Sequence, residues 1–144
     1  MKKFLILILF SILIPIHNSS AVSPSLDETM EFLINGDGGL SKRSWSITDC
    51  NLTIDDHSSK SILKIDLNKV IIESIKPYNR LGMGFYGECR GVCEKVFNSS
   101  GNQEGMPYPN RTGWTNMNDI KWNRNVKALS HLFGNFCTGA KSAF

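Results

Sequence analysis

The sequence predicts an α+β fold with a short N-terminal helix, a curved antiparallel sheet of about 5–7 strands, and a C-terminal helix packed on that sheet. Apolar residues recur at helical spacing in residues 26–34 and again in residues 122–136. Between these segments, several short runs alternate apolar and polar residues, which is typical of strands with one buried face.

Residues 22–144 are expected to form a single domain, because residues 1–21 have the layout of a secretory signal peptide. Two lysines precede an apolar run from Phe4 to Ile16, and small residues precede a cleavage site after Ala21. The run is shorter than the roughly 20 residues that a membrane span needs. We therefore expect a cleaved signal, a secreted or periplasmic location, and no stable membrane span in the mature chain.

The charge balance gives no reason to expect a nucleic-acid partner. The whole chain has a formal net charge of +3, to which Lys2 and Lys3 of the signal contribute. The mature chain is therefore close to neutral, and it has no run of lysines and arginines.

The mature domain is expected to begin with a short helix. Ser25 and Glu28 have the spacing of a capping box. Leu26, Met30, Leu33 and Ile34 then form an apolar stripe, and the glycines from residue 36 onward end the helix.

A hairpin is expected next. Apolar alternation runs through residues 45–54, but its phase changes at Asp49-Cys50, which predicts a bulge or bend within one long strand. Residues 55–59 have the composition of a turn. Alternation resumes over residues 63–67, which predicts the returning strand.

The rest of the chain has less regular patterns until its end. Residues 70–75 predict a strand buried on both sides, followed by a turn over residues 76–79. Residues 81–96 predict one or two strands with glycine bends, and residues 98–115 are mostly loop formers. Apolar residues at helical spacing predict the C-terminal helix from about Asn123 to Cys137.

The four cysteines of the mature chain are interpreted as disulfides, because an exported chain meets an oxidising environment. Cys89 and Cys93 can close a small loop on non-helical backbone, which leaves Cys50 to pair with Cys137. The other pairings and free thiols stay open as alternatives.

No cofactor or metal is expected. Cys89 and Cys93 form one C-x3-C pair without the second ligand cluster that zinc sites favour. Residues 82–87 match G-x-G-x-x-G. A dinucleotide site also requires a strand before this motif and a helix after it, and the flanking sequence predicts neither. We interpret these glycines as relieving a crowded or bent strand.

Two parts of the chain resemble a loose group of small uncharacterised secreted bacterial proteins. One contains D-C-N-L-T at Asp49-Cys50 and a strand that ends in D-L, and the other contains K-A-L-S-H-L from Lys127, followed by Cys137 and Gly139. The resemblance implies a pleckstrin-homology-like sheet with a C-terminal helix. It implies no activity and no catalytic residues.

The candidate ligand-binding surfaces are the mouth of the sheet and the stretch from Tyr108 to Asn125, where aromatic residues alternate with asparagines. Aromatic faces and amide groups together suit glycans or a protein partner. The residues nominated as ligand contacts are Tyr108, Trp114, Asn116 and Asn118.

The sequence favours a small non-catalytic binding module in the bacterial envelope or exterior, with a protein, glycan or lipid-like ligand. An inhibitor or immunity-type role is one form of this function. The alternatives are a small secreted hydrolase and a structural component of a surface assembly. A hydrolase would need a nucleophile near His57 or His131, and Ser58 and Ser130 are their neighbours in sequence alone.

Overall fold

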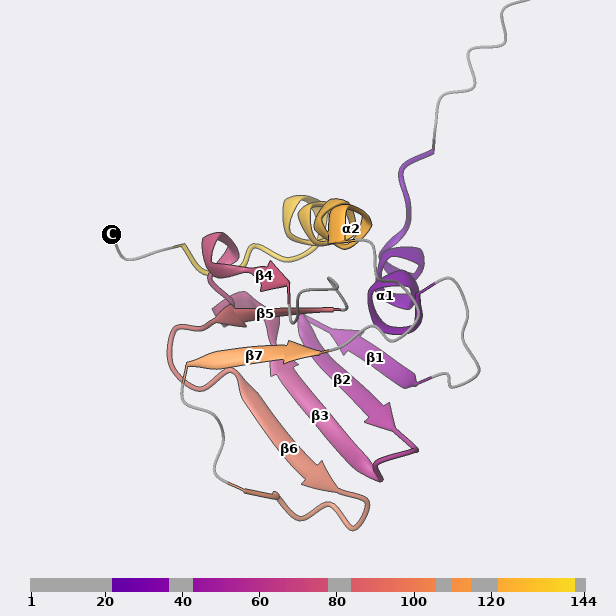
Figure 1. Cartoon of the computed structure of the whole chain (residues 1–144), viewed down its shortest axis with the longest axis vertical. Coiled ribbons are helices and arrows are strands. Elements are labelled where there is room, and N and C mark those ends of the chain that lie inside the picture. Colours follow the sequence, from indigo (N-terminus) through magenta and orange to yellow (C-terminus); the bar gives the residue numbers. More distant parts are fainter. Residues whose placement is uncertain (1–21, 37–42, 78–83, 106–109, 115–121, 142–144) are drawn as a thin grey trace, which may run out of the picture.

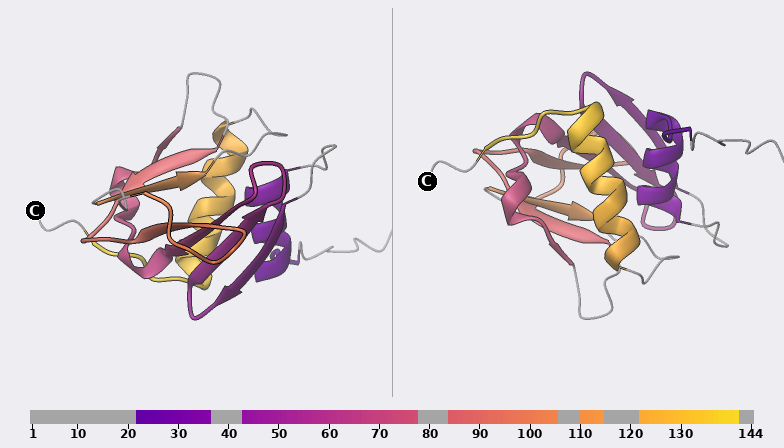
Figure 2. Two further views of the ribbon diagram at one scale, coloured as in Figure 1. Left: turned by 90° about the horizontal axis from the view of Figure 1, so that it is seen from below. Right: turned by 90° about the horizontal axis from the view of Figure 1, so that it is seen from above.

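The computed structural model describes residues 22–36, 43–77, 84–105, 110–114 and 122–141. Within these ranges, helices α1 and α2 lie side by side and cover two antiparallel sheets (Figures 1 and 2). The strand order is β1-β2-β3-β6 in one sheet and β4-β5-β7 in the other. The elements are α1 (Leu26–Asn35), β1 (Ser44–Thr48), β2 (Asn51–Asp56), β3 (Ser61–Asp66), β4 (Lys76–Pro77), β5 (Phe85–Glu88), β6 (Glu94–Asn98), β7 (Arg111–Trp114) and α2 (Trp122–Asn135).

This architecture confirms the α+β class and the C-terminal helix packed on the sheet. The strands are divided between two sheets instead of forming one curved sheet. The pleckstrin-homology-like arrangement stays a prediction, as does the signal peptide, since residues 1–21 lie outside the described ranges. In the described part of the chain, no helix has both the length and the apolar character needed to cross a bilayer.

Helix α1 begins as its sequence predicts. The hydroxyl of Ser25 accepts a 3.2 Å hydrogen bond from the backbone N–H of Glu28. In return, the Glu28 carboxylate accepts a 2.8 Å hydrogen bond from the Ser25 N–H. The capping box is therefore complete, and it presents the apolar stripe of Met30, Leu33 and Ile34 to the core.

The phase change at Asp49-Cys50 is a chain reversal, so the prediction of a bulge or bend in one long strand is wrong. Asp49 and Cys50 have φ values of 49° and 62°, which form a two-residue turn between β1 and β2. The turn starts a new strand in antiparallel register, and this is why the alternation changes phase. The returning strand β3 then confirms the predicted hairpin with β2.

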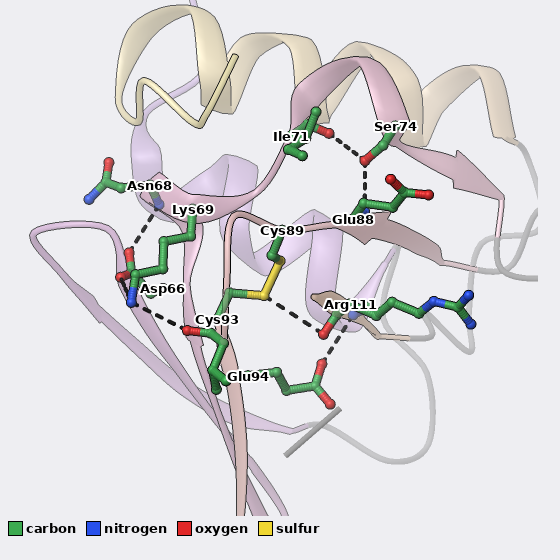
Figure 3. Close-up of a disulfide and its surroundings, with 12 residues drawn as sticks. Asp66, Asn68, Lys69, Ile71, Ser74, Glu88, Cys89, Cys93, Glu94 and Arg111 are labelled. Carbon is green, nitrogen blue, oxygen red and sulfur yellow. Dashed lines mark hydrogen bonds and ion pairs between the residues drawn. A yellow bond between two sulfur atoms is a disulfide. The ribbon is translucent and has the colours of Figure 1, made fainter. Parts of the chain in front are cut away.

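The segment predicted as a strand over residues 70–75 is mostly irregular, so that prediction is also wrong. It lies around two short 3-10 helices, at Leu67–Lys69 and Ile72–Ser74. The Ser74 hydroxyl donates to the Ile71 carbonyl oxygen and accepts from the Glu88 N–H (Figure 3). These side-chain bonds favour a turn over a strand ladder.

The remaining predictions are partly met. Strands β5 and β6 confirm the one or two strands expected in residues 81–96. Strand β7 lies inside the segment predicted as loop. Of the turn predicted over residues 76–79, Lys76–Pro77 instead pairs with β5 as strand β4, and residues 78–79 fall outside the described residues. Helix α2 starts and ends within a few residues of the prediction.

Both predicted disulfides are present. Cys50–Cys137 joins the β1–β2 turn to the chain just after α2, across 87 positions of sequence. Cys89–Cys93 closes the short connection between β5 and β6, and the Cys93 sulfur lies 3.7 Å from the Arg111 carbonyl oxygen of β7 (Figure 3). One bridge therefore fixes the end of α2 to the four-stranded sheet. The other holds together the ends of β5 and β6, which belong to different sheets.

Candidate functional site

Three of the four sheet edges are covered or short in the described part of the chain. The outer side of β6 pairs with the residues that follow it, since Glu104 N–H donates to the Val96 carbonyl oxygen and Asn98 N–H to that of Asn102. On β7, the Gly113 N–H donates to the Glu94 carboxylate. Strand β4 has two residues. The five-residue strand β1 is therefore the long edge with which no described segment pairs.

The register of β1 shows which backbone groups face outward. Thr48 and Asn51 flank the two-residue turn, so Thr48, Ser46 and Ser44 bond to β2. The N–H and C=O groups of Trp45 and Ile47 consequently point away from β2. Within the described ranges, no backbone group pairs with them.

Strand β1 also lacks the usual protection of an exposed edge. Natural edge strands often carry lysine, proline or a bulge that prevents pairing with another chain. Ser44–Thr48 has the sequence S-W-S-I-T, with no charge and no proline. The strand therefore retains the capacity to accept another strand.

A groove of about 740 Å³ lies between this edge and α1. Phe32, Trp45 and Ile47 supply its apolar surface. The Trp45 indole N–H donates a 2.8 Å hydrogen bond to the Glu31 carboxylate, which holds the ring against α1. The helix, the edge strand and the groove therefore form one continuous surface, which we call the β1 groove.

The β1 groove is negatively charged. Asp27, Glu28 and Glu31 line it, and none of its described lining residues is basic. The backbone N–H and then the hydroxyl of Ser25 lower the pKa of the Glu28 carboxyl, so it is ionised at neutral pH. Such a groove complements a cationic ligand.

A second groove, of about 390 Å³, lies between α1 and α2. Its lining combines Phe32 and Ala128 with the basic side chains Arg124 and Lys127. His131 borders it, with Nε2 2.7 Å from the Pro24 carbonyl oxygen and Nδ1 2.9 Å from the Asn135 side-chain nitrogen. We call it the helix groove. His131 thus holds the segment around Pro24 against α2. In the described ranges, no serine hydroxyl bonds to its ring.

The fold brings a serine, a histidine and an aspartate together where no sequence motif indicates them. Ser44 Oγ lies 3.0 Å from His57 Nε2, and His57 Nδ1 lies 3.5 Å from Asp55 Oδ1. Ser58, the sequence neighbour of His57, instead donates to Asp56. The signal that could have identified Ser44 is the hairpin register, which pairs Ser44 with Asp55.

This cluster lies in open solvent. The His57 and Asp55 side chains are 65% and 41% exposed, and neither lines one of the grooves above. Serine nucleophiles gain most of their catalytic power in enclosed sites with donors for the developing oxyanion. In the described residues, no group of three or more His, Cys, Asp or Glu side chains is arranged to hold a metal ion.

Of the four residues predicted to contact a ligand, the structure describes only Trp114, and that residue is buried. Trp114 is 4% exposed, its ring meets Phe85 edge to face with centroids 4.3 Å apart, and its indole N–H bonds to Leu33. Trp114 is therefore a core residue, which corrects its nomination as a ligand contact. The predictions for Tyr108, Asn116 and Asn118 fall outside the described residues.

Trp122 is partly buried and packs against the core, so it anchors the start of α2 on the sheets. No protein-family model, curated protein or solved structure matches the chain.

Proposed function

We propose that the mature chain is an exported, non-catalytic binding module of the bacterial envelope or exterior, and that its ligand is an extended segment of another protein. The segment adds to β1 as a new edge strand. The observation that carries this proposal is the open five-residue edge at β1, beside a groove, in a domain whose other described long edges are covered.

The backbone of Trp45 and Ile47 supplies the affinity in this mode, because their outward N–H and C=O groups bond to the added strand. The β1 groove supplies the selectivity. Alternate side chains of the added strand point toward α1, where Asp27 and Glu28 favour lysine or arginine. The ligand is therefore an extended segment with positive charges.

To test this, peptides that bind the mature domain are selected from a random library. Their affinities are then measured for the mature domain and for its variants. Ile47→Pro removes an outward N–H without breaking a bond to β2, whereas Ile47→Ala removes the same side chain and keeps the N–H. We expect selected peptides rich in lysine and arginine, with binding lost in Ile47→Pro and largely kept in Ile47→Ala. Equal binding to both variants would refute the edge-strand mode.

Hydrogen exchange on the unmodified domain gives a second readout that does not depend on a variant folding. Peptide addition should slow exchange at the Trp45 and Ile47 amides. Asp27→Lys should weaken binding about tenfold, and the matched change Glu73→Lys, on an exposed turn away from the groove, should not. Unchanged exchange at both amides contradicts the proposal.

Ester hydrolysis is a second candidate, favoured by the contacts among Ser44, His57 and Asp55. In that reaction Ser44 Oγ attacks the ester carbonyl while His57 Nε2 takes its proton and then gives it to the leaving alkoxide. A water molecule that His57 deprotonates then attacks the acyl–Ser44 ester, which releases the carboxylic acid and restores the Ser44 hydroxyl. A fluorophosphonate probe distinguishes the candidates. Hydrolysis is supported if the probe labels the parent and the Ser58→Ala variant but not the Ser44→Ala variant. If the probe does not label the parent, ester hydrolysis is refuted.

A further inference from the structure

The helix groove differs from the β1 groove in charge, although the two share Phe32 and Glu28 of α1. Arg124, Lys127 and His131 face it from α2, one to two turns apart on the same side of the helix. Its volume lies within the range of small-molecule sites. Helix α1 thus separates an acidic groove from a basic one.

The Arg124 side chain is held at the groove. Its guanidinium carbon lies 4.8 Å from the centroid of the Phe32 ring, which is a cation–π contact between α2 and α1. Lys127 lies one turn further along α2 and is exposed, so its ammonium can reach a ligand at the rim. Two positive charges therefore lie beside an aromatic surface.

One acidic residue, Glu28, also lines the groove, where the two basic side chains Arg124 and Lys127 outnumber it. The Glu28 carboxylate accepts hydrogen bonds from the Ser25 N–H and hydroxyl, at the positive end of the α1 dipole. Beyond it, Phe32, Ala128 and Pro24 give the groove an apolar lining. The groove therefore suits a ligand whose anionic head lies at the rim and whose apolar tail packs on this lining.

We propose that the helix groove binds a single long-chain carboxylate, a free fatty acid anion. Its carboxylate pairs with Lys127 and Arg124, and its alkyl chain covers Phe32 and Ala128. This site is separate from β1 and does not rest on the peptide-binding function.

Calorimetric titration of the mature domain with laurate, below its micelle concentration, tests this site. We expect one bound laurate per chain and binding at least about tenfold weaker for dodecyltrimethylammonium, which has the same chain length and the opposite charge. Equal binding of the two amphiphiles, or binding only to phospholipid vesicles, would overturn the proposal.

Variants locate the site. Lys127→Glu should weaken laurate binding about tenfold, while Lys60→Glu, on the β2–β3 turn, makes the same charge change and should have little effect. Ala128→Trp should fill the groove and abolish binding. Since Lys127 is exposed, its variant is expected to fold, and undiminished laurate binding in Lys127→Glu would overturn the assignment even where Ala128→Trp fails to fold.

Discussion

The indole N–H of Trp114 donates a 2.8 Å hydrogen bond to the main-chain carbonyl oxygen of Leu33, 81 positions earlier in the sequence. Leu33 lies in the last turn of α1, where carbonyl groups lack helical partners. Strand β7 thus supplies a donor to one carbonyl of the last turn of α1, and the Phe85 ring packs against the same indole.

Trp114→Phe should destabilise the domain, because it keeps an aromatic ring and removes this donor. The buried Leu33 carbonyl is left unsatisfied, at a cost of about 1–3 kcal/mol in the free energy of unfolding. Trp114→Ala should cost about 3–5 kcal/mol, since it also leaves a cavity. Urea unfolding measures both, and a Trp114→Phe variant as stable as the parent contradicts the role of the bond.

The local part of this fold is predictable from the sequence. The capping box depends on Ser25 and Glu28 alone, and the hairpin of β2 and β3 depends on adjacent alternating runs. The Asp49-Cys50 turn escapes prediction because both residues adopt positive φ without a glycine. Turns of this type usually contain Asn-Gly or Asp-Gly.

The candidate site is not predictable in this way, since it depends on long-range pairing. Among the described residues, strand β1 is an open edge because β6 joins the opposite side of the sheet and residues 102–104 then cover β6. The burial of Trp114 has a similar origin. Its loop-like neighbours in sequence give no sign that β5 and α1 enclose it.

The two disulfides should contribute unequally to stability. In the chain-entropy model, the loop closed by Cys50–Cys137 is worth about 4–5 kcal/mol and the loop closed by Cys89–Cys93 about 2 kcal/mol. Paired alanine variants of each bridge should therefore differ in urea midpoint, with the domain that lacks Cys50–Cys137 the less stable. Non-reducing peptide mass mapping checks the connectivity, and any peptide joining Cys50 to Cys89 would contradict it.

Gly113→Ala should strongly destabilise the smaller sheet. A Cβ at this position would overlap the Phe85 carbonyl oxygen and lie 2.8 Å from the Tyr86 Cα, and these backbone atoms cannot move away independently. Gly134→Ala is the matched control, because a Cβ there meets nothing within 4 Å and alanine is favoured over glycine in a helix, here in the last turn of α2. We expect Gly134→Ala to gain up to about 1 kcal/mol. Comparable stabilities of the two variants by thermal unfolding would be inconsistent with the close β5–β7 approach.

Asp56 should make the domain acid-sensitive. The Ser58 hydroxyl is the main cause of a lowered Asp56 pKa, and the Ser59 N–H and the Arg43 guanidinium, 3.2 Å away, lower it further against the opposing effect of burial. A carboxyl with a lower pKa in the folded state stabilises the fold above its unfolded pKa of about 3.9. That stabilisation is lost as the pH falls through the folded value.

Asp56→Asn tests this linkage, because it keeps the size of the side chain and removes the charge. The parent should be more stable than Asp56→Asn at pH 7, and the difference should shrink below about pH 4 as the parent carboxyl takes up its proton. Asp27→Asn is the control, since Asp27 is exposed on α1 away from this network. Melting temperatures of the three proteins from pH 7 to pH 2 measure the effect. If the parent and the Asp56→Asn variant differ by the same amount at both ends of that range, the Asp56 charge does not stabilise the β2–β3 turn.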